Sequence, residues 1–261
     1  KDALAEDPFD FYSKYHLALC YYHLEELELL KKNVQSLLSD YPDNDETHYI
    51  NSIYFSVIED NNLALKHINK AIKIAPYIAN YFGQKAMFLI NKKKFEEALS
   101  FANQGLSIDP KDSICLNTRT RILTKLNRKE EAYETLQNTL ADNPEDFFTH
   151  SNAGWTNLEL GNYEEANKHF KEALQKDPND EYAREGMLES IKARNVVYRY
   201  FLKYAFWIQN KSSNFQWGFI IGLYLIYRFS SKVLGGTGFN FLIPILAILY
   251  LVFVLVSWII T

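Results

Sequence analysis

Apolar residues recur at helical spacing along most of the chain, in segments that polar residues and proline interrupt at regular intervals. In one such segment Ile122 and Leu126 lie four residues apart, as on one face of a helix, and Asn127 ends the segment. We expect a second helix over residues 129–141, and Pro144 stops it because proline lacks an N–H donor and fixes its own φ. The pattern predicts an all-α protein built from pairs of antiparallel helices.

Proline marks the period of this pattern. Six of the seven prolines are spaced 34 residues apart, namely Pro8, Pro42, Pro76, Pro110, Pro144 and Pro178. A fixed period of this length is typical of stacked helix–turn–helix units. We therefore expect five full repeats of two helices each: Phe11–Asn44, Asp45–Ile78, Ala79–Asp112, Ser113–Asp146 and Phe147–Asp180.

Small residues recur at two further positions of the repeat, where paired helices must approach closely. The first repeat is the exception, because it has leucine at both positions. The twentieth position reads Leu30, Ala64, Ala98, Ala132 and Ala166, and the twenty-seventh reads Leu37, Ala71, Gly105, Thr139 and Ala173. Together with Gly154, Tyr163 and Phe170 in the last unit, this pattern resembles the tetratricopeptide-repeat family over residues 11–180. The resemblance implies a right-handed solenoid whose first helices line a concave surface.

The periodic pattern also predicts the domain boundaries. Residues 1–10 read as the end of a truncated repeat, because Ala3 and Pro8 fall at positions of a second helix whose first helix is absent. Residues 11–194 form the predicted solenoid, which includes a capping helix over residues 181–194. We expect an interfacial amphipathic helix with a linker at residues 195–213 and a transmembrane hairpin at residues 214–261.

The predicted interfacial helix is aromatic and basic. Lys192, Arg199 and Lys203 fall on one helical stripe, and Val197 and Phe201 fall on another, with Ala205 and Ile208 in line. Such a helix can lie at the level of lipid headgroups, with cations toward phosphates and rings at the boundary. The alternative interpretation is a capping helix that packs on the solenoid.

Two apolar runs predict the hairpin. The first, Phe215–Tyr227, is too short to span a bilayer alone, and its extension to Leu234 includes Arg228 and Lys232. The second, Phe239–Ile260, is uncharged and about 33 Å long as a helix. This region is similar to bacterial multi-pass repeat proteins, which implies that further spans follow. The competing interpretation is a hairpin buried in a water-soluble core.

Charge divides the chain in the same place. All 32 acidic residues lie at or before Glu189, whereas residues 190–261 carry seven basic residues and no acidic one. This asymmetry predicts contact with anionic headgroups. Five basic residues flank the spans on the repeat side and two on the linking side, which predicts a cytoplasmic repeat array at a bacterial inner membrane. The expected membrane-interface residues are Arg199, Lys203, Trp207, Trp217, Arg228 and Lys232. The acidic array disfavours nucleic acid.

No pattern indicates catalysis, a metal or a cofactor. Cys20 and Cys115 read as packing residues, and the six histidines lack ligand spacing. Residues 235–238 (GGTG) lack the following lysine of a phosphate loop and are interpreted as a turn.

Function is therefore expected on the concave surface. Its early repeats present an apolar, aromatic wall, and its later repeats present polar and cationic groups, which suits a protein or peptide partner. The candidate partner-binding residues are Tyr15, Leu19, Tyr22, Tyr49, Ile53, Asn117, Arg121, Lys125, Asn152 and Trp155. The carboxylate clamp of some relatives needs Lys and Asn at fixed positions, where this chain has Tyr15 and Leu19 or Asn117 and Arg121. The alternative is that these side chains pack against neighbouring helices.

These expectations combine into a membrane-anchored scaffold that binds a protein partner without catalysis. One alternative is an accessory or regulatory subunit of a membrane enzyme or transporter, in which Arg228 would face a partner inside the membrane. Another is a soluble chaperone adaptor.

Overall fold

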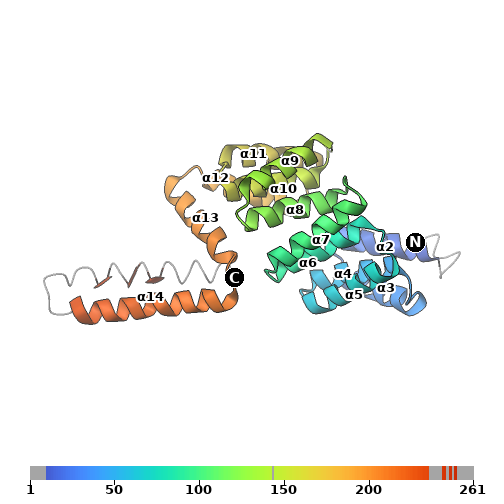
Figure 1. The fold of residues 1–261 in the computed structure, drawn as a ribbon, viewed down its shortest axis with the longest axis horizontal. Coiled ribbons are helices and arrows are strands. Elements are labelled where there is room, and N and C mark those ends of the chain that lie inside the picture. The colour runs from blue at the N-terminus through green and yellow to red at the C-terminus, as the bar shows by residue number, and fades with distance from the viewer. Residues whose placement is uncertain (1–9, 143, 235–242, 245–246, 249, 252–261) are drawn as a thin grey trace. The chain divides into compact units, whose positions relative to one another are not determined.

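The computed structural model describes residues 10–142 and 144–234, together with 243–244, 247–248 and 250–251 (Figure 1). Helices account for the regular structure of these residues, and the described part contains no strand. The chain divides into two compact units, Lys1–Thr156 and Asn157–Thr261, with the division inside helix α10. The all-α prediction is confirmed for the described residues.

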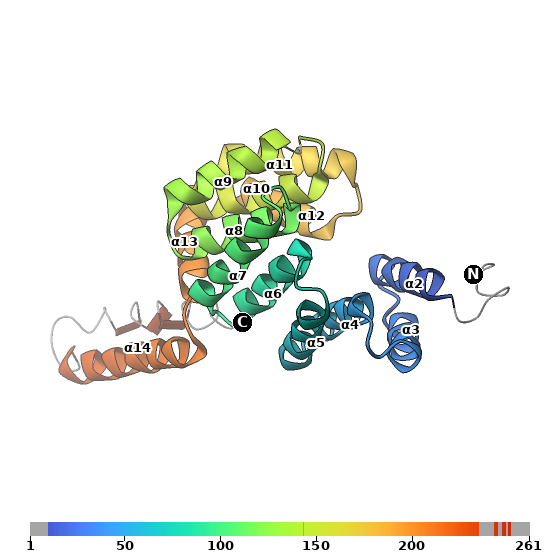
Figure 2. The ribbon, with the colours of Figure 1, turned by 45° about the vertical axis from the view of Figure 1, so that its right-hand side comes forward.

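The first unit, hereafter unit 1, is a stack of paired helices. Its helices are α2 (Phe11–His23), α3 (Leu27–Asp40), α4 (Asp45–Val57), α5 (Asn61–Ile74), α6 (Ala79–Asn91), α7 (Phe95–Ile108), α8 (Ser113–Lys125), α9 (Lys129–Asp142) and most of α10 (Phe147–Leu160). Helices α2, α4, α6 and α8 each pack against the second helix of their own pair, as Figure 2 shows for α4 and α5. First helices begin at every thirty-fourth residue, so the predicted repeats are confirmed.

Acidic or amide side chains begin most of these first helices. The side chains of Asp10, Asn44 and Asp112 accept hydrogen bonds of 2.7–2.8 Å from the backbone N–H groups of Ser13, Thr47 and Cys115. Each cap satisfies one of the N–H groups that a helix start leaves without a partner inside the helix. These caps share the period of the repeat, but α6 begins after Ile78, which has no side-chain cap.

The two recurring positions of the repeat lie where the helices meet. Leu30, Ala64, Ala98, Ala132 and Ala166 are all 0% exposed, as are Leu37, Ala71, Thr139 and Ala173. Gly105 leaves room for a neighbour, because a Cβ there would lie 2.3 Å from the sulfur of Cys115. The predicted close approach is confirmed, and Cys115 is a packing residue. Cys20, in contrast, is exposed, so its predicted packing role is wrong.

The second unit, hereafter unit 2, contains the end of α10 and then α11 (Tyr163–Lys176), α12 (Glu181–Lys192), α13 (Val196–Gln209) and α14 (Ser213–Leu234). Helix α12 packs against α11, as the predicted capping helix should. The aromatic ring of Phe170 on α11 is fully buried and faces Gly186 on α12. The side chain of Asn195 caps α13 through the N–H groups of Val197 and Tyr198.

No helix within the described residues is long and apolar enough to cross a membrane. The structure therefore gives no support to the transmembrane helix predicted for residues 214–234, where α14 includes Gln216, Arg228 and Lys232 among its apolar residues. The second predicted span, residues 239–260, and the GGTG turn lie largely or wholly outside the described residues. The predicted end of a truncated repeat, residues 1–10, also lies outside them except for Asp10.

Candidate partner-binding surface

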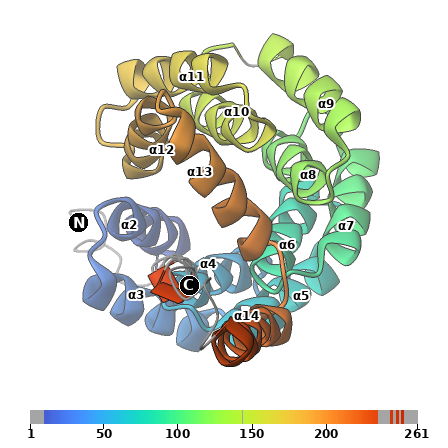
Figure 3. The same cartoon turned by 90° about the vertical axis from the view of Figure 1, so that its left-hand side faces the viewer.

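The first helices of unit 1 share one side of its arc. Figure 3 shows α2, α4, α6 and α8 on the inner side and their partners α3, α5, α7 and α9 on the outer side. The candidate residues from α2, α4 and α8 therefore belong to the inner helices, as predicted.

Aromatic rings form the early part of this surface. Tyr15 and Leu19 on α2 are half-buried, and Tyr22 is 38% exposed. The ring of Tyr15 stacks on that of Phe11, with 5.9 Å between centroids. On α4, half-buried Tyr49 stacks on Tyr81 of α6 at 5.1 Å. Aromatic pairs of this kind hold their rings in fixed positions.

Two carboxylates accompany these rings. The hydroxyl of Tyr81 donates a 2.8 Å hydrogen bond to the Asp45 carboxylate. Burial, together with the negative charges of Glu46 and Asp45, raises the pKa of Tyr15 to about 12. Burial and then the neighbouring Asp45 also raise the pKa of Glu46. Sequence reasoning assigned an apolar wall and missed this acidic component, although Asp45 and Glu46 stand beside the predicted Tyr49.

The later part of the surface is cationic. Arg121 and Lys125 on α8 are half-buried, and so is Trp155 on α10. Burial and then the charge of Lys125 lower the pKa of Lys93, which shows that the two ammonium groups lie near each other. This end of unit 1 therefore carries several positive charges.

Three of the candidate partner-binding residues are buried and do not line the surface. Ile53 is 8% exposed and belongs to the core between α2, α3 and α4. The Asn117 amide donates a 3.0 Å hydrogen bond to Thr149, and the Asn152 amide donates to the carbonyl of Phe148. For these three, packing against neighbouring helices, the alternative interpretation, describes the structure.

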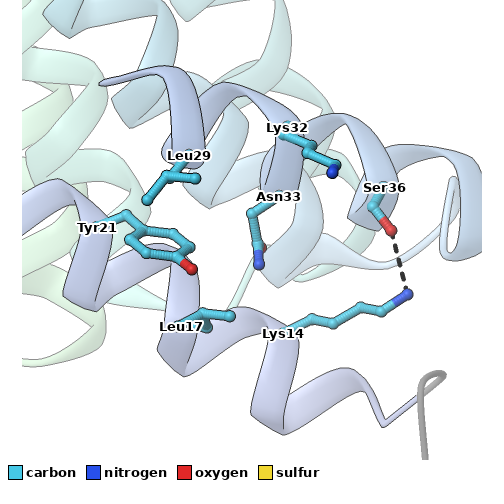
Figure 4. A pocket seen from close by; sticks show the side chains of 7 residues that line it. All are labelled: Lys14, Leu17, Tyr21, Leu29, Lys32, Asn33 and Ser36. Carbon is cyan, nitrogen blue, oxygen red and sulfur yellow. Dashed lines mark hydrogen bonds between the residues drawn. The ribbon is translucent and has the colours of Figure 1, made fainter. Parts of the chain in front are cut away.

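A separate pocket lies on the first helix pair. It has a volume of about 320 Å³ and is lined by Lys14, Leu17, Tyr21, Leu29, Lys32, Asn33 and Ser36 (Figure 4). The Lys14 ammonium reaches across to α3, where it donates to the Ser36 hydroxyl at 3.1 Å and to the Asp40 carboxylate at 2.5 Å. These bonds tie α2 to α3, so we assign Lys14 a structural role.

The predicted membrane-interface residues divide into two groups. Lys203, Trp207, Trp217, Arg228 and Lys232 are exposed, and the Arg228 guanidinium donates to the Tyr224 hydroxyl at 3.2 Å. Arg199 is different, because its Nε donates to the carbonyl of Ala193 at 2.7 Å and its guanidinium lies 5.1 Å from the Tyr163 ring.

The apolar stripe of α13 is covered toward the C-terminal end of the helix. Ala205 and Ile208 are buried, whereas Val197 is 78% exposed. The exposed stripe is instead Val196, Tyr200, Lys203 and Trp207, one step around the helix.

Comparisons with known proteins agree with this architecture. The family profile of the tetratricopeptide repeat matches residues 79–112 and again residues 147–180. A thermophilic TPR protein from Thermus thermophilus has a TM-score of 0.63 at 17% identity, over 69% of this chain and 98% of that one. No curated protein matches the chain at a significant level.

Two further solved structures share the fold at similar identity. Pseudomonas aeruginosa PilF has a TM-score of 0.53 at 16% identity, over 76% of this chain and 89% of its own. PilW, a type IV pilus biogenesis factor, has a TM-score of 0.54 at 18% identity, over 72% of this chain and 94% of its own. Identities this low establish the fold alone. The chain therefore contains tetratricopeptide repeats and forms an all-α solenoid of the kind that these repeats build.

Proposed function

We propose that unit 1 is a non-catalytic scaffold whose inner helices bind a peptide segment of a protein partner. The observation that supports this proposal is that tyrosines on α2 and α4 and half-buried cations on α8 belong to helices on the same inner side of unit 1. Tyrosine and arginine supply much of the energy at protein interfaces, because they combine a large contact area with polar groups.

The charges of this surface indicate which residues the bound peptide should contain. A segment with apolar or aromatic residues would contact Tyr15, Leu19 and Tyr22, and acidic residues would pair with Arg121 and Lys125. The Asp45 and Glu46 carboxylates favour a basic residue at the aromatic end. The expected ligand is thus an amphipathic segment with separated basic and acidic ends.

Peptide selection tests this proposal. A displayed random library would be selected on the full chain, and the affinity of each peptide would be measured by fluorescence anisotropy. Arg121→Glu should weaken binding at least about tenfold, because reversing a contacting charge replaces attraction by repulsion. Lys66→Glu on α5 is the matched control, since Lys66 is exposed on a second helix. Equal affinity for Arg121→Glu and wild type would refute the proposed surface.

We also propose, as a second function, that α13 and α14 attach the protein to a lipid surface. The exposed stripe of Val196, Tyr200, Lys203 and Trp207 favours it, because rings and cations together suit the headgroup boundary. Tryptophan fluorescence should shift to the blue when phospholipid vesicles are added, and Trp207→Ser should reduce the shift. Emission that vesicles leave unchanged would contradict attachment.

A further inference from the structure

A second cavity lies within unit 2, where α11, α12 and α13 meet. Its volume is about 500 Å³, and its lining residues are Tyr163, Glu164, Asn167, Lys168, Ser190, Arg194 and Arg199. Cavities of this size are typical of small-molecule sites. None of the candidate residues for partner binding lines it, so the cavity is distinct from the inner surface of unit 1.

Cations dominate the lining. The Lys168 ammonium pairs with Glu165 at 2.8 Å, which leaves two guanidiniums, Arg194 and Arg199, against one carboxylate, Glu164. Among the described residues, no carboxylate lies within ion-pair distance of either guanidinium. The lining therefore carries two guanidiniums without a paired carboxylate, of which Arg194 is exposed and Arg199 is half-buried.

Arg199 is held in place for such a role. Its Nε donates to the backbone carbonyl of Ala193, at the end of α12, and its guanidinium lies over the ring of Tyr163. These contacts occupy the Nε–H group and one face of the Arg199 guanidinium. Its two terminal nitrogens have no hydrogen-bond partner among the described residues. A guanidinium fixed in this way loses little entropy when it binds an oxyanion.

The remaining lining is polar and ordered. The Asn167 amide donates to the Ser190 hydroxyl at 2.8 Å, and Ser190, only 2% exposed, donates in turn to the carbonyl of Met187. The side of the cavity formed by α11 and α12 is therefore a fixed hydrogen-bonded surface. The two arginines are therefore the charged groups that would contact a ligand in this cavity.

We propose that this cavity binds the phosphate of a phosphate ester, with Arg194 and Arg199 on its oxygens. Guanidiniums bind phosphate through paired N–H groups, and Arg194 and Arg199 give the lining the positive charge that such binding needs. The volume accommodates an organic substituent in addition to the phosphate. A soluble phosphate ester and the headgroup of a phospholipid share this chemistry.

Two binding measurements on the full chain test the proposal. Isothermal titration with glycerol 3-phosphate probes the soluble ester, and co-sedimentation with phosphatidylcholine vesicles, with or without phosphatidylglycerol, probes the headgroup. Arg194→Gln should weaken whichever binding is observed about tenfold, since it removes a charge-assisted contact. Arg194→Lys should lie between wild type and Gln, because it keeps the charge but loses the paired geometry.

The matched control is Lys171→Gln, which removes an exposed charge on α11 outside the cavity lining. Binding of either ligand that Arg194→Gln weakens and Lys171→Gln preserves supports the proposal and identifies the source of the phosphate. Binding that both variants weaken equally would reveal general charge attraction and overturn it. Absence of binding in both measurements would overturn it as well.

Discussion

At the scale of single residues, the loop inside each repeat depends on one left-handed backbone position. Glu25, Glu59, Lys93 and Asn127 have φ between 57° and 60°, and Gly161 has φ 90° at the same place in the fifth repeat. After each of them, the next residue donates its N–H to a carbonyl five residues back. This motif ends the first helix. Glycine adopts it without strain, whereas for other residues it costs energy.

We predict that Glu59→Gly raises the free energy of unfolding by about 1 kcal/mol, because it relieves this backbone strain. The measurement is urea unfolding followed by circular dichroism. Lys66→Gly, inside α5, is the control, and it should lower the same free energy by about 1 kcal/mol. If Glu59→Gly lowered the free energy of unfolding as much as Lys66→Gly does, the backbone at Glu59 would not be strained.

A glycine in unit 2 has a packing role. A Cβ at Gly186 would lie 2.2 Å from the Phe170 ring, so Gly186→Ala should cost about 1–3 kcal/mol of stability through overpacking. Gly218→Ala is the control, because nothing lies within 4 Å of its Cβ position and alanine favours helix. Thermal unfolding of both variants would test this contrast. A melting temperature of Gly186→Ala equal to that of the wild type would contradict the close packing of Phe170 on Gly186.

At the scale of elements, a buried histidine pair joins α4 to α5. The Nδ1 atoms of His48 and His67 are 3.1 Å apart, and Phe55 stacks on His67 with 5.2 Å between ring centroids. Burial lowers the pKa of His67 to about 4, with further contributions from His48, Lys70 and Lys66. Burial and Lys70 lower the pKa of His48 as well, and Asp43 opposes that effect.

This pair predicts acid sensitivity. Unfolded histidine titrates near pH 6.5, so between about pH 6.5 and 4 the unfolded chain binds more protons than the folded one. The neutral pair therefore stabilises the fold fully above that range. Stability should fall by on the order of 2 kcal/mol as pH drops through it.

His67→Gln should flatten this pH dependence, because glutamine can still hydrogen-bond to His48 but does not titrate in this range. The free energy of unfolding would be measured by urea titration at several pH values. His16→Gln serves as the control, since His16 is exposed on α2. A slope that His67→Gln leaves unchanged would exclude the pair as its source.

The elements themselves follow closely from the sequence. Proline at a fixed period and small residues at two positions act locally or between adjacent helices, so they predicted the repeat bounds and, in the fourth repeat, both helices to within a residue. Contacts between side chains of different helices depend on the rotamers of both partners, so the spacing of residues in the sequence does not predict them. The stacking of Tyr49 on Tyr81, the histidine pair and the cavity at Arg199 are of this second kind.

The face of α13 shows the same limit. Its residues are aromatic on nearly every side, so periodicity alone could not decide which stripe is covered. Burial of Leu202, Ala205 and Ile208 decides it in the structure. For α14, apolar composition suggested a span, but no helix among the residues that the structure describes is long and apolar enough to cross a membrane.

At the scale of the whole molecule, the proposed function depends on which helices of unit 1 meet the partner. The charge arrangement predicts a salt-sensitive interaction, because Arg121 and Lys125 are partly accessible to screening ions. Affinity for an acidic selected peptide should therefore fall as sodium chloride rises from low to physiological concentration. An affinity that does not depend on salt would assign binding to the tyrosines alone.

Photo-crosslinking tests the central claim most directly. A selected peptide with a photoreactive phenylalanine would be bound to the full chain and irradiated, and the crosslinked residues would be mapped by mass spectrometry. We predict crosslinks on α2, α4 and α8, at or beside Tyr15, Tyr22 and Arg121. Crosslinks confined to the outer helices α3, α5, α7 and α9 would contradict binding at the inner surface.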